Sequence, residues 1–490
     1  MKVNQNVSAV ISNAHLHRTE NKLTASIERL SSGYKINKAK DNPAGMAISN
    51  KMRAQIMALD QSSRNASDGT SVMQTADGAL NETHSMLQRI RELCVQAATD
   101  TMTTSDKEAC QQEIEALQEE IDRIATDTEF NGKRILDGSQ DYRVYPSVDG
   151  ELAGTYIRNF QTSDEVSAED YKFSITQVPE QAQIDAFEVV PGTAGTVEIN
   201  GCSVEILDTD TSDDIYKKLQ EAAELGGVKV EQNGTDQYKL TSFEYGKSAK
   251  ISAIALDGTE TTAEGKNTEI NMVRDTDQKK NPDGSGMEDA DGNPVLYGEG
   301  FSGTATYLSD GKKVTIRDLN GFKMVFEIDP EMDMNHVLDG VNPDPANPQK
   351  VDVDLEVTDI GSMTLQIGAH ENQVVDVRIP AVTCESLYID DLNVVRKGGA
   401  DKAIAALDDA IAQVSEVRSR IGAYQNRLEY ATGSLDETEE NMEAAISRIM
   451  DTDMAEEMST YSNMNVLDQA AISVLTQAND MPQQVLQLLQ

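Results

Sequence analysis

The chain has 490 residues, contains no tryptophan, and has only 4% aromatic residues. That is little for a large globular core, but it is normal for a chain dominated by long helices. The four cysteines, Cys94, Cys110, Cys202 and Cys384, are too sparse for a disulfide scaffold and show no Cys-x-x-Cys or Cys/His metal spacing. We therefore expect packing, rather than cross-links or bound metals, to hold the fold together.

Long apolar runs and basic charge are also scarce. No apolar run approaches the roughly 18 to 20 residues that a membrane span needs, so we expect no membrane insertion. The first residues lack a basic patch followed by an apolar stretch, so we expect no cleavable secretory signal. Lysine and arginine number 42 against 84 aspartates and glutamates, a net charge of −42. Nucleic acid and anionic membranes are therefore poor partners.

The composition divides the chain into three parts. Residues 1–140 hold 16 basic and 19 acidic side chains, and residues 391–490 hold 7 and 17, whereas residues 141–390 hold 19 and 48. Ten of the 12 prolines also lie in the middle part, and proline is confined to edges and turns of regular structure. We predict a multi-domain fold, mainly an α-helical coiled-coil rod formed by both chain ends, with a β-rich (α+β) central insert.

Both ends show the three-and-four spacing of apolar residues that is typical of coiled coils. One helix is predicted from Pro43 to about Thr99, a shorter return helix follows the turn at residues 101–106, and a second long helix covers residues 404–449. The seam of the first helix consists of residues seven apart: Leu59, Ala66, Met73, Leu80, Leu87 and Cys94. The terminal segments carry narrow apolar stripes that must be buried against partner helices, including Leu23, Ile27, Leu30, Leu467, Val474, Val485 and Leu488.

The middle part has strand and turn patterns instead. Residues 197–206 read as a hairpin that turns at Asn200-Gly201, followed by a short helix capped by Ser212 or Asp213. With strands at 228–232 and 238–241, this predicts a small α/β unit over residues 195–256. Further strands are predicted at 313–317, 324–328, 351–357, 363–367 and 374–379.

The sequence shows no catalytic or metal-binding constellation. His370-Glu371 begins like the zinc motif His-Glu-x-x-His, but position 374 is valine. We therefore expect no enzyme activity, no cofactor and no metal.

Several blocks at both ends resemble one known family. Glu28–Asn37 and Ala39–Ser49 closely resemble the N-terminal signature of bacterial flagellins, and the likeness continues through Gln88–Leu93. At the other end, Gly422–Leu428 and Gln477–Leu489 also look like flagellin. The resemblance covers nearly all of residues 1–140 and 361–490.

The resemblance implies a structural subunit that is exported unfolded and self-polymerises into the bacterial flagellar filament for swimming. Residues 1–42 and 452–490 would form the filament core, and residues 43–140 and 361–451 a helical tube with a β-hairpin. Residues 141–360 would form the outer part, in a secreted, extracellular flagellum. The alternative is a hook-filament junction protein, which shares the helical ends. We also expect the terminal segments to be largely disordered in the free monomer, because isolated narrow-striped helices bury too little surface to order.

The resemblance also implies partners. Besides further copies of itself, the chain would meet a flagellar export chaperone, the filament cap and hook-associated proteins, and a host Toll-like receptor. The positions that match the receptor-recognition residues of the family are Arg89, Leu93 and Glu113. The same three residues could instead serve contacts between subunits, and both roles are compatible.

Two cysteines lie close together in the predicted helical hairpin. Cys94 and Cys110 are eight residues either side of the turn near residue 102, each on the apolar seam of its helix. Antiparallel helices would bring them together. Two alternatives stay open: buried thiols that pack as small apolar groups, or a disulfide formed after export.

Overall fold

The computed structural model describes residues 6–99, 101–148, 151–152, 156–163, 165–233, 237–274, 300–332, 351–358 and 360–488. The chain folds into two compact units. One comprises residues 1–70, 365–375 and 426–490, and the other residues 71–364 and 376–425. The three-part division by composition stays a prediction.

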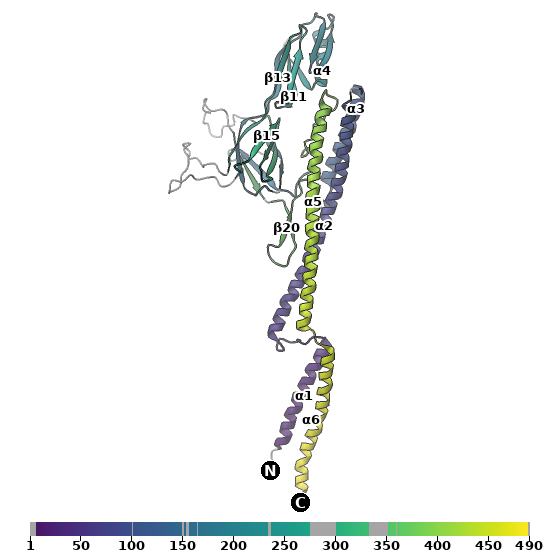
Figure 1. Cartoon of the computed structure of the whole chain (residues 1–490), viewed down its shortest axis with the longest axis vertical. Coiled ribbons are helices and arrows are strands. Elements are labelled where there is room, and N and C mark those ends of the chain that lie inside the picture. Colours follow the sequence, from purple (N-terminus) through teal and green to yellow (C-terminus); the bar gives the residue numbers. More distant parts are fainter. Residues whose placement is uncertain are drawn as a thin grey trace, which may run out of the picture. The chain divides into compact units, whose positions relative to one another are not determined.

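The two ends of the chain are helical and the middle is rich in strands, as the sequence predicts (Figure 1). Helix α2 starts where its capping residue indicates: Asn42 Oδ1 accepts a hydrogen bond from the Gly45 N–H at 2.9 Å, and Pro43 is the first helical residue. The helices are α1 (Val7–Ser32), α2 (Pro43–Ala97), α3 (Thr104–Asp127), α4 (Ser212–Leu225), α5 (Gly399–Met450) and α6 (Met454–Leu488).

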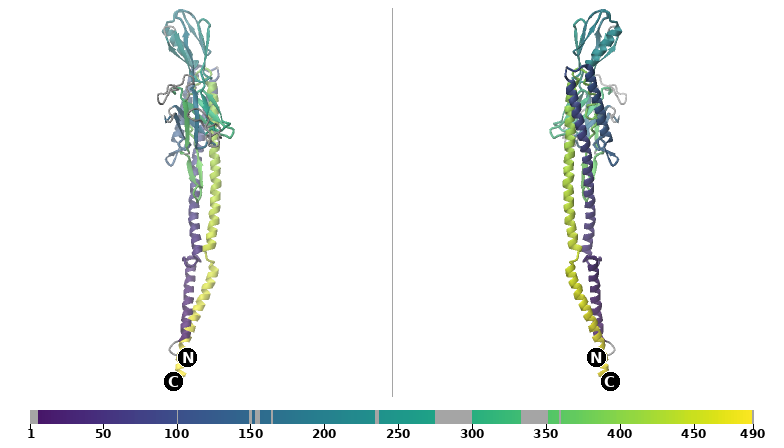
Figure 2. Two further views of the ribbon diagram at one scale, coloured as in Figure 1. Left: turned by 90° about the vertical axis from the view of Figure 1, so that its left-hand side faces the viewer. Right: turned by 90° about the vertical axis from the view of Figure 1, so that its right-hand side faces the viewer.

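In the second unit, α2, α3 and α5 lie side by side (Figures 1 and 2). The predicted seam of α2 is buried throughout, and Met73, Leu80, Leu87 and Cys94 are completely inaccessible. Two ion pairs join α2 to α5: the exposed pair of Arg91 with Asp408 at 2.6 Å and the half-buried pair of Arg418 with Asp77 at 2.9 Å. Apolar packing therefore holds these helices together, since ion pairs open to solvent contribute little.

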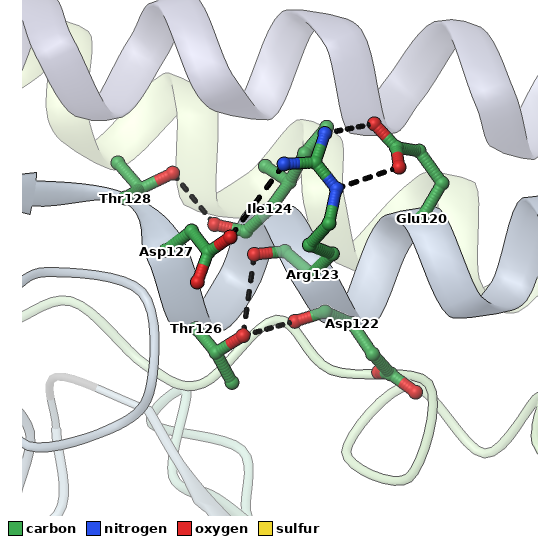
Figure 3. Close-up of polar contacts among 7 residues, drawn as sticks. All are labelled: Glu120, Asp122, Arg123, Ile124, Thr126, Asp127 and Thr128. Atoms are coloured by element: carbon green, nitrogen blue, oxygen red, sulfur yellow. Dashed lines mark hydrogen bonds and ion pairs between the residues drawn. The ribbon is translucent and has the colours of Figure 1, made fainter.

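Polar side chains end α3 at a defined residue. The Arg123 guanidinium lies between Glu120, at 2.8 Å, and Asp127, at 3.5 Å (Figure 3). The Thr128 hydroxyl and the Thr128 N–H both donate to the Ile124 carbonyl, at 2.6 and 3.1 Å respectively. The chain then turns into the short hairpin of β1 (Glu129–Phe130) and β2 (Lys133–Arg134).

Two antiparallel sheets form the first β-sandwich. Its core contains the stacked rings of Phe173 and Phe326, whose centroids are 5.2 Å apart. One sheet has the order β14-β6-β18-β3-β4 and the other β15-β16-β17-β5. The strands are β3 (Arg143–Val148), β4 (Glu151–Leu152), β5 (Ile157–Thr162), β6 (Asp170–Gln177), β14 (Glu269–Met272), β15 (Thr306–Asp310), β16 (Lys313–Arg317), β17 (Lys323–Ile328) and β18 (Val351–Thr358).

The second β-sandwich contains α4 and the predicted small α/β unit, and it is larger than predicted. Asn200 and Gly201 have φ of 48° and 78°, as the predicted hairpin turn requires. The expected cap at Ser212 or Asp213 is wrong: Thr211 caps α4 in a reciprocal bond with Asp214. The sheets have the orders β10-β11-β7 and β13-β12-β8-β9. The strands are β7 (Gln181–Glu188), β8 (Gly195–Ile199), β9 (Cys202–Ile206), β10 (Val228–Gln232), β11 (Gln237–Tyr245), β12 (Lys250–Ile254) and β13 (Glu260–Glu264).

A glycine joint, Gly246, Gly265 and Gly311, connects the two sandwiches. A Cβ atom at Gly246 would lie 2.6 Å from both the nitrogen and the Cα of Gly311. Asn267 ties the joint together, accepting from the Lys247 N–H at 2.7 Å and donating to the Ser309 carbonyl at 2.8 Å. The backbones can approach this closely only because the side chains are absent.

The remaining hairpin, β19 (Met363–Gln366) and β20 (Val374–Val377), contacts α2. Asn65 Nδ2 donates to the Gln366 carbonyl at 3.1 Å, and Leu365 fills the space above Gly69. The absence of a side chain at Gly69 thus lets the hairpin lie against the helix.

Candidate functional site

The first unit pairs the two ends of the chain, α1 and α6, side by side (Figures 1 and 2). Asn6 caps α1, because its Oδ1 accepts from the Ala9 N–H at 3.2 Å, and its Nδ2 donates to the Ala478 carbonyl at 2.8 Å. That carbonyl lacks its usual helical partner, since residue 482 is a proline and has no N–H. The Asn6 side chain therefore forms hydrogen bonds both with the first turn of α1 and with the α6 carbonyl that Pro482 leaves without a helical donor. Helix α6 continues through Pro482.

The seam between α1 and α6 is unusually polar. Its half-buried and buried residues recur at three-and-four spacing: Ser12, Leu16, Thr19, Leu23, Ser26 and Leu30 on α1, and Glu457, Met464, Asp468, Ala471, Leu475 and Ala478 on α6. Ser26 Oγ, Glu457 Oε1 and Asp468 Oδ1 are buried without a hydrogen-bond partner. Buried polar atoms without partners cost stability, so this seam is a weak one.

Large apolar side chains of the pair point outward instead. Val10 is 69% exposed, and Leu467 and Val474 are each 53% exposed. Among the side chains that the structure describes, the exposed large apolar ones are Val7, Val10, Ile11 and Ile27 on α1, and Met454, Met458, Val466, Leu467, Ile472, Val474 and Met481 on α6. Exposed large apolar side chains in this number are typical of helices that bind another protein.

The predicted polymerisation residues divide between the two faces. Leu23 and Leu30 are half-buried in the seam, whereas Ile27, Leu467 and Val474 are on the exposed face. The side chains of Val485 and Leu488 lie outside the described part of the chain. The predicted list omits Val466 and Ile472, which do not lie on the heptad positions of that segment.

The predicted receptor residues lie on α2 and α3. Arg89 donates to Glu113 at 2.8 and 3.0 Å and to Glu92 at 3.3 Å, and the hydrogen bond to Glu113 is the main reason that the pKa of Arg89 is raised. Arg89 and Glu113 are both about half exposed, and together they form a charged surface. Leu93 is only 2% exposed, so it supports this surface from beneath.

The two predicted neighbouring cysteines are buried and free. Burial raises the pKa of the Cys94 thiol to about 11, and nearby Cys110 adds to the effect. Cys384 is also buried, and burial likewise raises its pKa. A disulfide between Cys94 and Cys110 stays a prediction.

The partial zinc motif at His370-Glu371 gains no support from the structure. His370 and Glu371 lie in the turn between β19 and β20 rather than on a helix, so they lack the setting of the zinc motif. Within the described ranges, no group of three His, Cys, Asp or Glu residues is placed to hold a metal ion. The helices, as far as they are described, include none apolar and long enough to cross a membrane.

Comparison with known proteins identifies the family. Residues 3–141 match the bacterial flagellin N-terminal helical region, and residues 404–489 the bacterial flagellin C-terminal helical region. The flagellin of Clostridium tyrobutyricum is 32% identical over 486 residues, covering 99% of this chain and 100% of the relative. The flagellin of Escherichia coli K12 is 32% identical over 525 residues, covering 100% of this chain and 99% of the relative.

Solved structures that align with the chain include a flagellar hook-associated protein 3 of Legionella pneumophila. The identity is 13% and the TM-score 0.30, with 82% of this chain and 98% of that chain covered. A superposition this loose gives no support to the junction-protein alternative, whereas the full-length relatives above are flagellins. The chain therefore belongs to the bacterial flagellin family, the structural subunits of the flagellar filament.

Proposed function

We propose that α1 and α6 complete their packing only against other copies of the chain, so that the ordering of these helices and filament assembly are one coupled step. The observation that carries this proposal is the outward apolar face, which includes Val10, Leu467 and Val474. In the single chain these side chains lie in water. In a polymer they would be buried, at roughly 1.5 to 3 kcal/mol for each large aliphatic group.

The polar seam supports the same proposal. Ser26, Glu457 and Asp468 place unpaired polar atoms where a stable coiled coil has aliphatic side chains. Helices gain most of their stability from packing an apolar face, and this pair leaves several of its large apolar side chains outside the seam. The single chain should therefore open its terminal pair often, which would keep subunits from associating before they reach a growing filament end.

Hydrogen exchange on monomer and filament tests this coupling. We expect backbone amides of α1 and α6 to exchange within seconds to minutes in the monomer and to be strongly protected in the filament. Amides around Leu80 and Leu87 in α2 serve as the control, because their buried seam should protect them in both states. Strong protection of residues 23–30 in the monomer would contradict the proposal.

The same weak pairing fits passage through a narrow export channel. A terminal pair that opens readily can be threaded in extended form, and the exposed face of α6 needs cover inside the cell. An export chaperone would supply that cover, and the filament cap and hook-associated proteins would meet the same helices outside. The subunit would then act in the extracellular filament.

We further propose that the charged surface of Arg89 and Glu113 contacts a host Toll-like receptor. The two side chains are joined across α2 and α3 and remain about half exposed, so they can donate and accept in a complex. Leu93 would act by holding α2 in place beneath them.

Replacing Arg89 by alanine should reduce receptor signalling by the purified monomer at least tenfold, as the loss of a charged interface residue typically does. A receptor-reporter cell line measures the effect. Arg64→Ala is the matched control, because Arg64 is also an exposed arginine of α2 paired with an acidic residue, Asp60. Unchanged signalling by the Arg89 variant would remove this residue from the surface.

A further inference from the structure

Methionine is prominent among the apolar side chains that α6 exposes. Met454, Met458 and Met481 are each about half exposed. A fourth methionine of this helix, Met464, is half-buried in the seam with α1. On α1, by contrast, the large apolar side chains that the structure describes as exposed are valines and isoleucines. The two terminal helices therefore expose apolar groups of different chemistry, because only those of α6 include sulfur.

The exposed methionines lie on two different sides of α6. Met481 continues the exposed stripe of Leu467 and Val474, since these residues are seven apart, or about two turns of helix. Met454 and Met458 are four apart and share one side of the helix. Met458 and Leu467 are nine residues apart, about two and a half turns, so their side chains point in opposite directions. A chemical change of these three residues would therefore alter both exposed sides of α6.

A thioether differs from the aliphatic groups around it because it can be oxidised. An oxygen-transferring oxidant such as hydrogen peroxide gives one oxygen atom to the sulfur: the O–O bond breaks, an S=O bond forms, and the peroxide is reduced to water. The sulfur thereby loses two electrons and becomes the polar sulfoxide, which disrupts apolar interfaces.

We propose that Met454, Met458 and Met481 are oxidation sites at which an oxygen-transferring oxidant blocks assembly of the free subunit. In the single chain their sulfur atoms are open to solvent, and in a filament they would be covered by other copies. Covering a sulfoxide costs free energy, since a polar group then loses its water. Oxidation would thus stop monomers from joining, whereas subunits already in a filament would be shielded. This inference rests on the proposed coupling of assembly to the terminal helices.

The cysteines of the chain are placed differently. Cys94, Cys110 and Cys384 are buried, and burial raises the pKa of the Cys94 and Cys384 thiols. Cys202 is half-buried, and burial raises the pKa of its thiol as well. The thiolate is the form of cysteine that reacts, whereas a thioether has no proton to lose. Mildly acidic conditions therefore direct the oxidant to methionine.

Oxidation of monomer and filament in parallel tests the proposal. The full-length chain is treated with hydrogen peroxide at about pH 6, where thiols are protonated, and peptide mass spectrometry measures the sulfoxide at each methionine. In the monomer, the three methionines should react about as fast as Met57, an exposed residue of α2. In the filament they should react about tenfold more slowly or less, because they are covered. Seeded assembly of the oxidised monomer, followed by sedimentation, should show a critical concentration that is raised about tenfold or more.

A leucine variant separates the sulfur from the shape of the side chain. Met454→Leu with Met458→Leu and Met481→Leu keeps apolar groups of similar volume and removes the three sulfur atoms. It should assemble within about threefold of the wild-type critical concentration both before and after peroxide treatment. Met57→Leu is the matched control, because it removes an exposed methionine outside α6, and oxidation should still block its assembly.

Enzymatic reduction supplies a test that needs no variant. The two methionine sulfoxide reductases, one for each sulfoxide epimer, should restore assembly of the oxidised wild-type monomer. Unchanged assembly by a chain whose three methionines are oxidised would overturn the inference. Equal loss of assembly in the treated leucine variant, or no recovery after complete reduction, would overturn it as well, and each result would leave coupled assembly intact. Strong protection of α1 and α6 amides in the untreated monomer would instead overturn the proposed function.

Discussion

Replacing Leu467 and Val474 by aspartate is expected to abolish filament assembly while leaving the fold of the rest of the chain unchanged. Each side chain is 53% exposed in the single chain, so the substitution removes no core contact there. In a filament, each replacement loses roughly 1.5 to 3 kcal/mol of apolar burial and adds the cost of covering a carboxylate. The critical concentration should therefore rise by more than about 100-fold.

Electron microscopy and sedimentation after seeding measure this effect, and circular dichroism reports the fold. The control is Leu319→Asp, because Leu319 is a large apolar residue that is 87% exposed but lies in the first sandwich. That variant should assemble like the wild type. Normal filaments from the double variant at wild-type concentrations would show that the outward face of α6 is not part of the contact.

The second large effect concerns the glycine joint. Replacing Gly246 by alanine should destabilise the sandwiches, because the new Cβ would lie 2.6 Å from backbone atoms of Gly311 and 2.5 Å from Asn267 Oδ1. Gly246 also has a φ of 88°, which alanine adopts at a cost of roughly 1 to 2 kcal/mol. Forcing the backbones apart adds roughly 1 to 3 kcal/mol.

A matched variant separates the two costs. Gly258 has a similar φ of 80°, but nothing lies within 4 Å of the position of its Cβ. Gly258→Ala should therefore lower the free energy of unfolding only by the conformational cost of a positive φ. Gly246→Ala should lower it clearly more. Urea unfolding followed by tyrosine fluorescence can measure both, since Tyr171 and Tyr238 are in the two sandwich cores and no tryptophan interferes. Equal losses of unfolding free energy in the two variants would mean that the backbones at the glycine joint can separate without cost.

The helical ends could be predicted from the sequence because their signals are local. Heptad spacing identified the buried seam of α2, including Leu80 and Leu87, and Asn42-Pro43 marked its first residue. The hairpin turn at Asn200-Gly201 was equally local, since asparagine and glycine adopt the positive φ that such turns need.

Features of the fold that depend on residues distant in the chain were harder to predict from the sequence. The pairing of β7 with β11 joins strands that are distant in the chain, and β7 lies outside the predicted unit of residues 195–256. The cap of α4 was misplaced by one residue because Thr211, Ser212 and Asp213 are all good capping residues. Only the reciprocal bond with Asp214 distinguishes Thr211.

The candidate site was also predicted only in part. Apolar spacing predicted that Leu23, Ile27 and Leu467 belong to interfaces, but spacing alone does not say which face meets the chain's own partner helix. That choice depends on burial across α1 and α6, which placed Leu23 inside and Leu467 outside. The family resemblance indicated Arg89, Leu93 and Glu113 as receptor residues, whereas the ion pair of Arg89 with Glu113 and the burial of Leu93 needed the structure.

The hydrogen bond from Asn6 to Ala478 joins positions that are 472 residues apart, so everything between them forms one closed loop. The entropy of closing a flexible loop grows only with the logarithm of its length, and doubling the length costs about 0.6 kcal/mol. The free energy of pairing the two terminal helices should therefore depend little on how much protein lies between them. Whole domains could be gained, lost or grafted in the middle while the same terminal pair still closes, which makes this subunit a suitable carrier for foreign sequences.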